Sequence, residues 1–124
     1  MDRELKAKIL ARAAVFEVMS RLGTKIHLSN IQWSHIEARH KELRGQLDKM
    51  KLTLTEPDAV YRSVGEETHH YYKKFSSTPV SEKYMLLVTK HREGEGFIIT
   101  AFFVAKIRKR EKVQVYGSKN SDLV

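Results

Sequence analysis

The longest uncharged, predominantly apolar stretch of the chain reads Gly96-Phe97-Ile98-Ile99-Thr100-Ala101-Phe102-Phe103-Val104-Ala105. In an extended chain over 97–107, alternation places Phe97, Ile99, Ala101 and Phe103 on one side and Ile98, Phe102 and Val104 on the other. A strand with two apolar faces is typical of the interior of a sheet. We therefore expect a central strand at 97–107. Its Thr100 is the one polar side chain within the apolar run and needs a hydrogen-bond partner or an opening to solvent.

Shorter runs with β propensity lie on both sides of this stretch. Four of them are expected to be strands, namely Ala59–Ser63, Thr68–Phe75, Tyr84–Lys90 and Val113–Tyr116. The separators at 65–67, 76–81 and 93–96 are short and rich in turn residues, which favours antiparallel neighbours. Because helices are expected before the strands, the chain is predicted to be α+β, with N-terminal helices packed on a twisted antiparallel sheet of four to five strands.

Three helices are expected in the first half of the chain. The first spans about 3–22, on an apolar stripe that includes Leu5, Ile9, Phe16 and Met19. An extended segment follows at 25–28. The second helix begins after Ser29, which forms a capping-box pattern with Gln32, and ends near residue 43. A third helix is expected at about 44–54, where the apolar residues again recur every three or four positions.

The composition excludes several classes of protein. The 124 residues include no cysteine, which excludes disulfides, thiolate catalysis and cysteine-ligated zinc. No glycine-rich phosphate loop is present, so no cofactor is expected. Charges interrupt the apolar residues near the N-terminus, and the stretch at 96–105 is well short of the roughly 20 residues of a membrane-spanning helix. We therefore expect one domain over 1–124 that is cytoplasmic and has no membrane partner.

The charge balance favours a polyanionic partner. The chain has 23 Lys and Arg residues against 15 Asp and Glu residues, a formal net charge of +8, and nucleic acid is the first candidate for so basic a chain. A basic run at the end of the expected central strand includes Lys106, Arg108, Lys109 and Arg110. These side chains could guide an RNA backbone; the alternative is the solvated end of a strand.

The expected second helix carries the densest polar cluster. His35 and Arg39 are four residues apart and share one face, while Ile36 and His40 share the neighbouring face. Arginine can hold phosphate oxygens bidentately, and histidine titrates near neutral pH, so the pair suits phosphodiester cleavage. The alternative is an ordinary solvated helix face.

A second polar cluster lies in the strand expected at 68–75. Alternation points His69, Tyr71, Lys73 and Phe75 to one side and His70, Tyr72 and Lys74 to the other. The neighbouring histidines diverge, so no metal site is expected. Aromatic residues between lysines suit single-stranded nucleic acid, which makes Tyr71 and Lys74 candidate RNA-binding residues. The alternative is a core face of Tyr71 and Phe75 beneath a basic face.

Four motifs follow one another along the chain. They are Trp33-Ser34-His35-Ile36-Glu37-Ala38-Arg39-His40, Pro57-Asp58, Tyr71-Tyr72-Lys73 and Ile99-Thr100-Ala101. In this order they resemble the phage and mobile-element branch of the nuclease superfamily that groups barnase, EndoU, the tRNA-cleaving colicins and RelE-type toxins. The resemblance covers about 26–116 as a nuclease-like core. Residues 1–23 are then an added N-terminal helix, and 117–124 are expected to be a flexible tail.

The resemblance implies a metal-independent, toxin-like ribonuclease activity. Carried over motif by motif, the catalytic residues would be His35, Arg39, Lys73 and Thr100, with His40 and Tyr72 as secondary candidates. Two positions depart from the pattern. Lys41 stands where relatives often have proline, and Phe102 stands where they often have tyrosine. Relatives also keep the scaffold without the activity, so fold and catalysis are separate expectations.

These observations lead to one hypothesis and one alternative. The hypothesis is an endoribonuclease, with tRNA as one candidate target, in which the 2′-hydroxyl attacks the adjacent phosphate. His35 would transfer the proton, Arg39 and Lys73 would stabilise the phosphorane, and Thr100 would bind a non-bridging oxygen or orient the sugar. It requires these four side chains to converge in one cleft. The alternative is a non-catalytic RNA-binding or protein-interaction module, and an inhibitor or antitoxin protein is a further candidate partner.

Overall fold

The computed structural model describes residues 2–5, 13–65 and 67–118. The first half contains β1 (Ala14–Met19), β2 (Lys25–Ser29), α2 (Asn30–Arg39), the 3-10 turn η1 (Lys41–Leu43) and α3 (Leu47–Thr55). The second half contains β3 (Ala59–Ser63), β4 (Thr68–Lys74), β5 (Tyr84–Arg92), β6 (Glu95–Val104) and β7 (Lys112–Gly117). No helix in the described ranges is long and apolar enough to cross a membrane.

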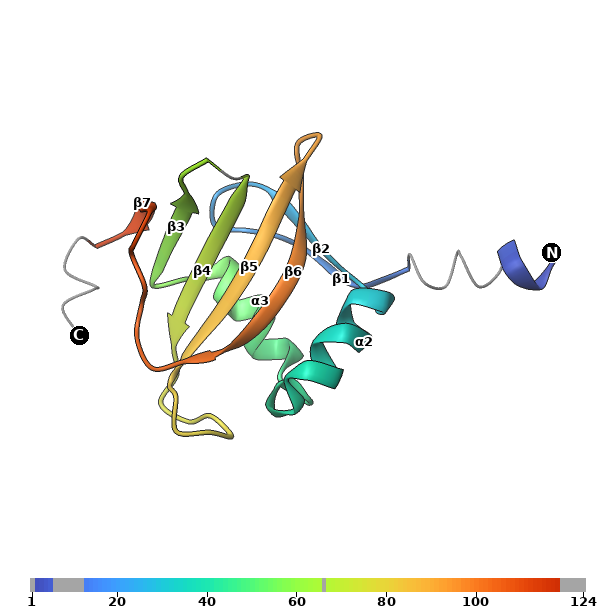
Figure 1. Ribbon diagram of the computed structural model, residues 1–124, viewed down its shortest axis with the longest axis horizontal. Coiled ribbons are helices and arrows are strands. Elements are labelled where there is room, and N and C mark those ends of the chain that lie inside the picture. The colour runs from blue at the N-terminus through green and yellow to red at the C-terminus, as the bar shows by residue number, and fades with distance from the viewer. Residues whose placement is uncertain (1, 6–12, 66, 119–124) are drawn as a thin grey trace.

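All seven strands belong to one sheet, in the order β1-β2-β6-β5-β4-β3-β7 (Figure 1). Neighbours are antiparallel except β2 and β6, which are parallel. The predicted α+β class is therefore confirmed, and β3 to β6 form the predicted antiparallel meander. The expected four to five strands are too few, because β1 and β2 extend the sheet beyond β6 and make it mixed.

The predicted helix over 3–22 is wrong for the residues that form β1. Phe16 and Val18 pair with Leu28 and Ile26 of β2, and Phe16 is buried in the core. The segment is rich in aromatic and β-branched residues, which favour strands. Its backbone N–H and C=O groups form their hydrogen bonds with β2, whereas in a helix they would form them within the segment. Residues 3–5 are helical, whereas 6–12 of the predicted helix lie outside the described residues.

The predicted start of the second helix is confirmed at its cap. The Ser29 hydroxyl accepts a hydrogen bond from the backbone N–H of Gln32 at 3.2 Å. The side chain of Gln32 does not complete the capping box; it donates to the backbone carbonyl of Ile99 in β6. Because β2 pairs with only Gly96 and Phe97 of β6, the edge of β6 beyond them is free for this contact. Helix α2 ends at Arg39, earlier than predicted, and η1 leads to α3.

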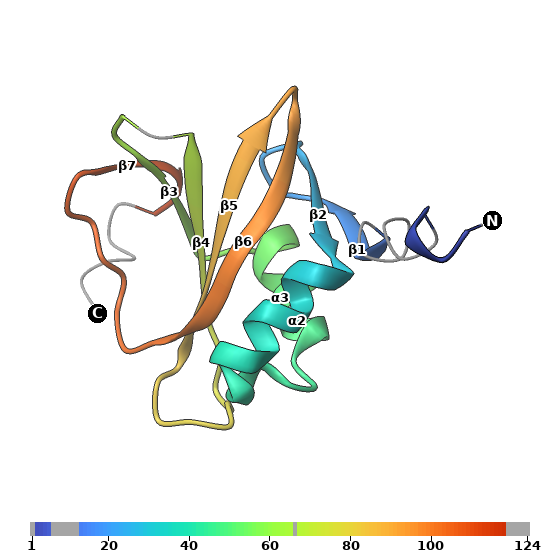
Figure 2. The same cartoon turned by 45° about the vertical axis from the view of Figure 1, so that its right-hand side comes forward.

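The two helices pack on one face of the sheet, which we call the helix-side face (Figure 2). Their apolar residues close a core with alternate residues of the strands. This helix-side cluster contains Phe16, Ile26, Leu28, Ile36, Leu43, Met50, Leu54, Val60, Tyr71, Met85, Leu87, Ile98, Ala101 and Phe103. The opposite face, which we call the outer face, carries a second cluster. This outer cluster contains Ala59, Tyr61, Tyr72, Tyr84, Leu86 and Val88, with Phe102, Val104 and Ile107 against it.

A β-bulge in β6 changes the expected alternation of the central strand. Val88 pairs with Thr100 and Thr89 pairs with Ile98, so Ile99 is the extra residue. As a result Ile98 and Ala101 are both buried in the helix-side cluster. The prediction that Phe97 and Ile99 share the side of Ala101 is wrong, because the bulge leaves Phe97 and Ile99 41% and 40% exposed.

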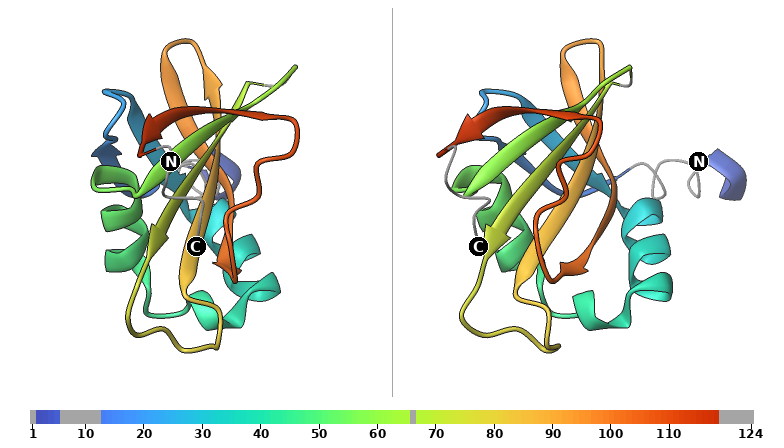
Figure 3. Two further views of the ribbon diagram at one scale, coloured as in Figure 1. Left: turned by 90° about the vertical axis from the view of Figure 1, so that its left-hand side faces the viewer. Right: turned by 60° about the vertical axis from the view of Figure 1, so that its left-hand side comes forward.

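The connection between β6 and β7 crosses the outer face in the half of the sheet where β6 ends (Figure 3). Ile107 packs on the outer cluster, and the backbone N–H of Arg108 donates to the Tyr72 hydroxyl at 3.4 Å. The other half, beside the β3–β4 and β5–β6 turns, is hollowed. This open half is the part of the sheet that a ligand can reach.

Candidate nucleic-acid interface

His35 and Arg39 are both exposed on α2. The helix is anchored by Ile36, which is 1% exposed in the helix-side cluster, so the neighbouring positions turn towards solvent. Neither His35 nor Arg39 is held by a hydrogen bond or an ion pair within the described part of the chain. The two side chains are therefore available to a ligand, but nothing fixes their geometry.

Lys73 and Thr100 lie on opposite faces of the sheet. Lys73 pairs with Met85 of the helix-side cluster, and its Nζ donates to the carbonyl of Glu56 at 2.8 Å, beyond the end of α3. Thr100 pairs with Val88 of the outer cluster. Because directly paired residues share a face, the sheet separates the ammonium group from the hydroxyl. The structure thus contradicts the requirement that all four predicted catalytic side chains converge in one cleft.

The two secondary candidates are held against the protein. His40 caps the end of α2 and stacks on Phe102, with ring centroids 5.2 Å apart, and its Nδ1 lies 3.6 Å from Glu42 Oε1. Tyr72 is 1% exposed beneath the β6–β7 connection. Burial raises the pKa of the Tyr72 phenol, so this hydroxyl stays protonated at neutral pH.

Tyr71 is fully buried and offers no ring surface to a base. Its hydroxyl donates to Ser20 Oγ at 2.9 Å, and the ring lies in the helix-side cluster with Phe75 against it. Of the two interpretations of the 68–75 strand, the core face is the one that the structure supports. Lys74 is exposed, as an RNA contact would require, with its Nζ 5.8 Å from the centre of the Tyr84 ring.

The predicted basic run lies in the β6–β7 connection. The side chains of Lys106, Arg108, Lys109 and Arg110 are all exposed. Ile107 points inward and fastens the connection to the outer cluster. The run is therefore a strap of cations across the outer face, which is compatible with the proposed role as a guide for a phosphate backbone.

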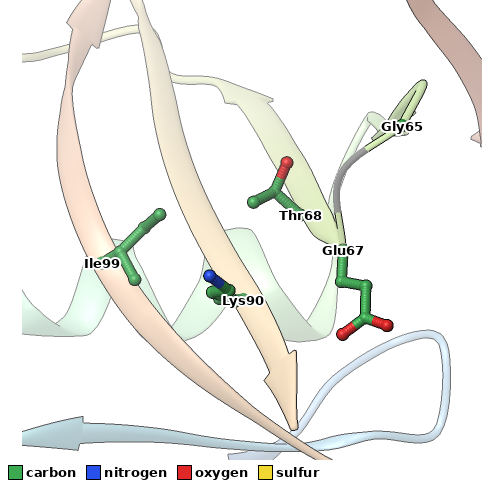
Figure 4. Close-up of a pocket in the computed structure, with 5 residues that line it drawn as sticks. All are labelled: Gly65, Glu67, Thr68, Lys90 and Ile99. Carbon is green, nitrogen blue, oxygen red and sulfur yellow. The ribbon is translucent and has the colours of Figure 1, made fainter.

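Residues that sequence reasoning missed line the open half of the outer face. One hollow of about 190 Å³ is lined by Lys90, Arg92, Phe97 and Ile99. An adjoining hollow of about 510 Å³ is lined by Gly65, Glu67, Thr68, Lys90 and Ile99 (Figure 4). Lys90 and Arg92 are two apart on β5, and Lys90 pairs with Phe97 across the β5–β6 hairpin. That spacing was visible in the sequence, but the exposure of Phe97 depended on the bulge.

Phe97 is fixed from the side of β2. His27 stacks on its ring with centroids 5.1 Å apart and an interplanar angle of 20°. The two ring nitrogens of His27 are in turn held by carboxylates, with Nδ1 3.1 Å from Glu17 and Nε2 3.0 Å from Glu95. The remaining surface of Phe97 is therefore a preorganised aromatic platform.

The cations beside this platform are not neutralised. Every ion pair within the described ranges involves His27 or His40, so neither Lys90 nor Arg92 has a carboxylate partner there. Among these residues no group of three His, Cys, Asp or Glu side chains is arranged to hold a metal ion. The open half thus combines an aromatic ring with two cations that form no ion pair among the described residues, while Glu67 lines the adjoining hollow and Glu17 and Glu95 lie against His27.

Comparison of the chain with protein-family models, with curated proteins and with solved structures gave no match.

Proposed function

We propose that the protein binds single-stranded RNA on the open half of its outer face. The observation that carries the proposal is Phe97, which is 41% exposed, held by His27 and flanked by Lys90 and Arg92. An unpaired base has a free face to stack on such a ring, while ammonium and guanidinium groups contact its phosphates. Double-stranded RNA presents no free base face, so it is the weaker ligand.

The strap extends the same surface. Lys106, Arg108 and Arg110 are exposed on the connection that crosses the outer face. A strand stacked at Phe97 can therefore pass from the β5–β6 hairpin towards cations on the strap. Phosphate contacts of this kind release counterions, so binding should weaken steeply as salt is raised.

Binding of an RNA oligonucleotide of about ten nucleotides, followed by fluorescence anisotropy, tests the proposal. Phe97→Ala should weaken binding by roughly 5- to 100-fold, the range expected for one lost base stack. Lys90→Ala should reduce the salt dependence. Val113→Ala is the matched control, because Val113 is also an exposed apolar strand residue, 45% exposed on β7. Equal binding by Phe97→Ala and Val113→Ala would contradict the proposal.

A second candidate is metal-independent cleavage of the bound RNA, favoured by the exposed His35 and Arg39 on one face of α2. The 2′-oxygen bonds to phosphorus as His35 takes its proton, and Arg39 stabilises the phosphorane. The bond from phosphorus to the 5′-oxygen then breaks, and this oxygen takes a proton from water, which leaves a 2′,3′-cyclic phosphate. Lys73 has no part in this scheme, because its Nζ already donates to the carbonyl of Glu56.

Cleavage is tested by incubating tRNA and total RNA with the protein in excess EDTA. Products that disappear in His35→Ala and persist in His40→Ala would support the scheme. In cells, a toxin-like enzyme should arrest growth on expression, and Arg39→Ala should relieve the arrest. Intact RNA together with tight, salt-sensitive binding would leave the non-catalytic module as the function.

A further inference from the structure

A third hollow, of about 220 Å³, lies at the β7 side of the outer face and has a polar lining. It is lined by Ser63, Val64, His70, Arg110, Glu111 and Lys112. Its walls come from the β3–β4 hairpin and from the turn that leads into β7. None of these residues contributes to the Phe97 platform, so the two sites are separate.

The walls of this hollow are held in place by backbone hydrogen bonds. The N–H of Val64 donates to the carbonyl of Glu111 at 3.0 Å, and the N–H of Lys112 donates to the carbonyl of Lys109 at 3.1 Å. Ser63 and Lys112 are paired in the β3–β7 ladder. The turn that carries Arg110 and Lys112 is therefore fixed against the hairpin, and the two cations approach the hollow from a rigid support.

The lining has an excess of positive charge. Arg110 and Lys112 face one carboxylate, that of Glu111, and neither cation forms an ion pair with a described residue. The Ser63 hydroxyl adds a neutral donor. Two cations and a hydroxyl around a small polar hollow are the groups that bind phosphate oxygens.

His70 lies at the wall of the hollow with unused hydrogen-bonding capacity. Its Nε2 is 3.1 Å from Ser63 Oγ, while its Nδ1 is buried without a partner among the described residues. Burial first, and then the charge of Lys112, lower the pKa of His70 to about 4, so the imidazole is neutral at pH 7. A serine activated for nucleophilic attack needs a histidine that a third group orients, and no group orients Nδ1 here. The pair therefore fits ligand binding better than hydrolysis.

We propose that this hollow binds a phosphate monoester as its dianion, through Arg110, Lys112 and the Ser63–His70 pair. The dianion matches the two cations, and its charge offsets the effect of Lys112 on the imidazole. A proton on His70 then costs less than in the empty hollow, even though Arg110 also faces the site, because the ligand contributes two negative charges. The ligand is the terminal phosphate of an RNA or a free nucleotide; both present the same dianion. Neither source requires RNA binding at Phe97.

The test is an NMR titration of the full chain with inorganic phosphate at pH 7.5, at which most of the phosphate is the dianion, following the ring C–H signals of His70. We expect a saturable shift and a rise in the pKa of His70. Lys112→Gln and, as a second and fully exposed variant, Arg110→Gln should each weaken phosphate binding by about tenfold or more, as expected for a lost charge-assisted hydrogen bond. Lys25→Gln is the control, because Lys25 is an exposed lysine on β2 that does not line the hollow.

Further arms identify the source and the limits of the site. A nucleoside monophosphate should shift the His70 signals as inorganic phosphate does, and an RNA with a terminal phosphate should shift them more than the same RNA with hydroxyl ends. Phe97→Ala should leave phosphate binding unchanged, so failure of the RNA proposal and failure of this one are distinguishable. Absence of a saturable shift, equal binding by Lys112→Gln and Lys25→Gln, or a response only to RNA with hydroxyl ends would overturn the proposal.

Discussion

The helix-side face and the outer face are built from the same strands but are covered in different ways. Two helices fill the helix-side face, and the lysine on it, Lys73, is bonded to the carbonyl of Glu56. The outer face is crossed by one connection, and beside its open half Lys90 and Arg92 have no carboxylate partner in the described ranges. Residue type alone therefore does not make a ligand site. A cation on a covered face supports the fold, whereas a cation on an open face remains available.

The largest expected effect is the difference in stability lost when one apolar side chain is truncated on each face. Leu87 is fully buried in the helix-side cluster, and Leu87→Ala should lower the free energy of unfolding by about 2–5 kcal/mol. Ile99 is 40% exposed on the open half, and Ile99→Ala should cost about 0.5 kcal/mol or less. Urea unfolding followed by circular dichroism measures both. Equal losses of unfolding free energy in the two variants would show that the open half is packed as tightly as the core.

Acid should destabilise the fold through two histidines on opposite faces. Burial first, and then nearby cationic groups such as Lys112 beside His70, lower the pKa of both His69 and His70 to about 4 in the folded chain. The unfolded chain, with histidine pKa values near ~6.5, then binds more protons between these values. Stability is therefore full above pH 6.5 and falls as the pH drops towards 4. We expect a loss on the order of 1–2 kcal/mol per histidine after allowance for solvent screening.

Denaturant unfolding at a series of pH values measures this loss. His69→Gln and His70→Gln should each flatten part of the profile. His69 stacks near His91 on the helix-side face, with ring centroids 4.2 Å apart. Phosphate should consequently restore stability only through His70. If the unfolding free energy of the unmodified chain did not change between pH 4 and 6.5, the pKa of neither imidazole would be lowered in the folded chain.

A smaller effect compares two neighbouring tyrosines. The Tyr71 hydroxyl donates to Ser20 at 2.9 Å on the helix-side face, whereas the Tyr72 hydroxyl accepts from Arg108 at 3.4 Å on the outer face. Tyr71→Phe should cost about 1 kcal/mol of unfolding free energy, and Tyr72→Phe less, because the longer bond contributes less. Thermal and urea unfolding of the two variants rank them. The reverse ranking would mean that the strap is held more firmly than the core contact.

The smallest expected effect concerns the two lysines that differ only in the face they occupy. Lys73→Ala should cost roughly 1 kcal/mol or less of stability, because a single exposed hydrogen bond to Glu56 is lost. It should leave RNA binding unchanged. Lys90→Ala should leave stability unchanged and weaken binding. Anisotropy and unfolding measurements on both variants provide the comparison, and a binding defect in Lys73→Ala would return that residue to the candidate site.

Local patterns predicted the elements that depend on local interactions. The cap at Ser29 was predictable because the hydroxyl and the N–H that it accepts from are three residues apart. The strands from β3 to β5 were predictable because their β-branched and aromatic residues lie between short turns. β1 was mistaken for a helix because its apolar residues also fit helical spacing, and the pairing that selects a strand there comes from β2.

The candidate site was predicted less well than the fold. Exposure of His35, Arg39 and Lys74 agrees with their predicted availability, but the burial of Tyr71 and the position of Lys73 do not fit the predicted roles. Strand alternation correctly divided residues 69–75 between two faces. It could not say which face the helices would cover, because that depends on contacts between residues far apart in the chain.

The amino-acid sequence by itself determined the charge, the α+β class, the meander and the set of candidate polar residues, because these follow from composition and short-range periodicity. Only the tertiary structure decided which of those residues can meet a ligand. The bulge at Ile99 exposed Phe97, the β6–β7 connection buried Tyr72, and the sheet separated Lys73 from Thr100. Each of these outcomes depends on pairing or packing between distant segments, which no local pattern encodes.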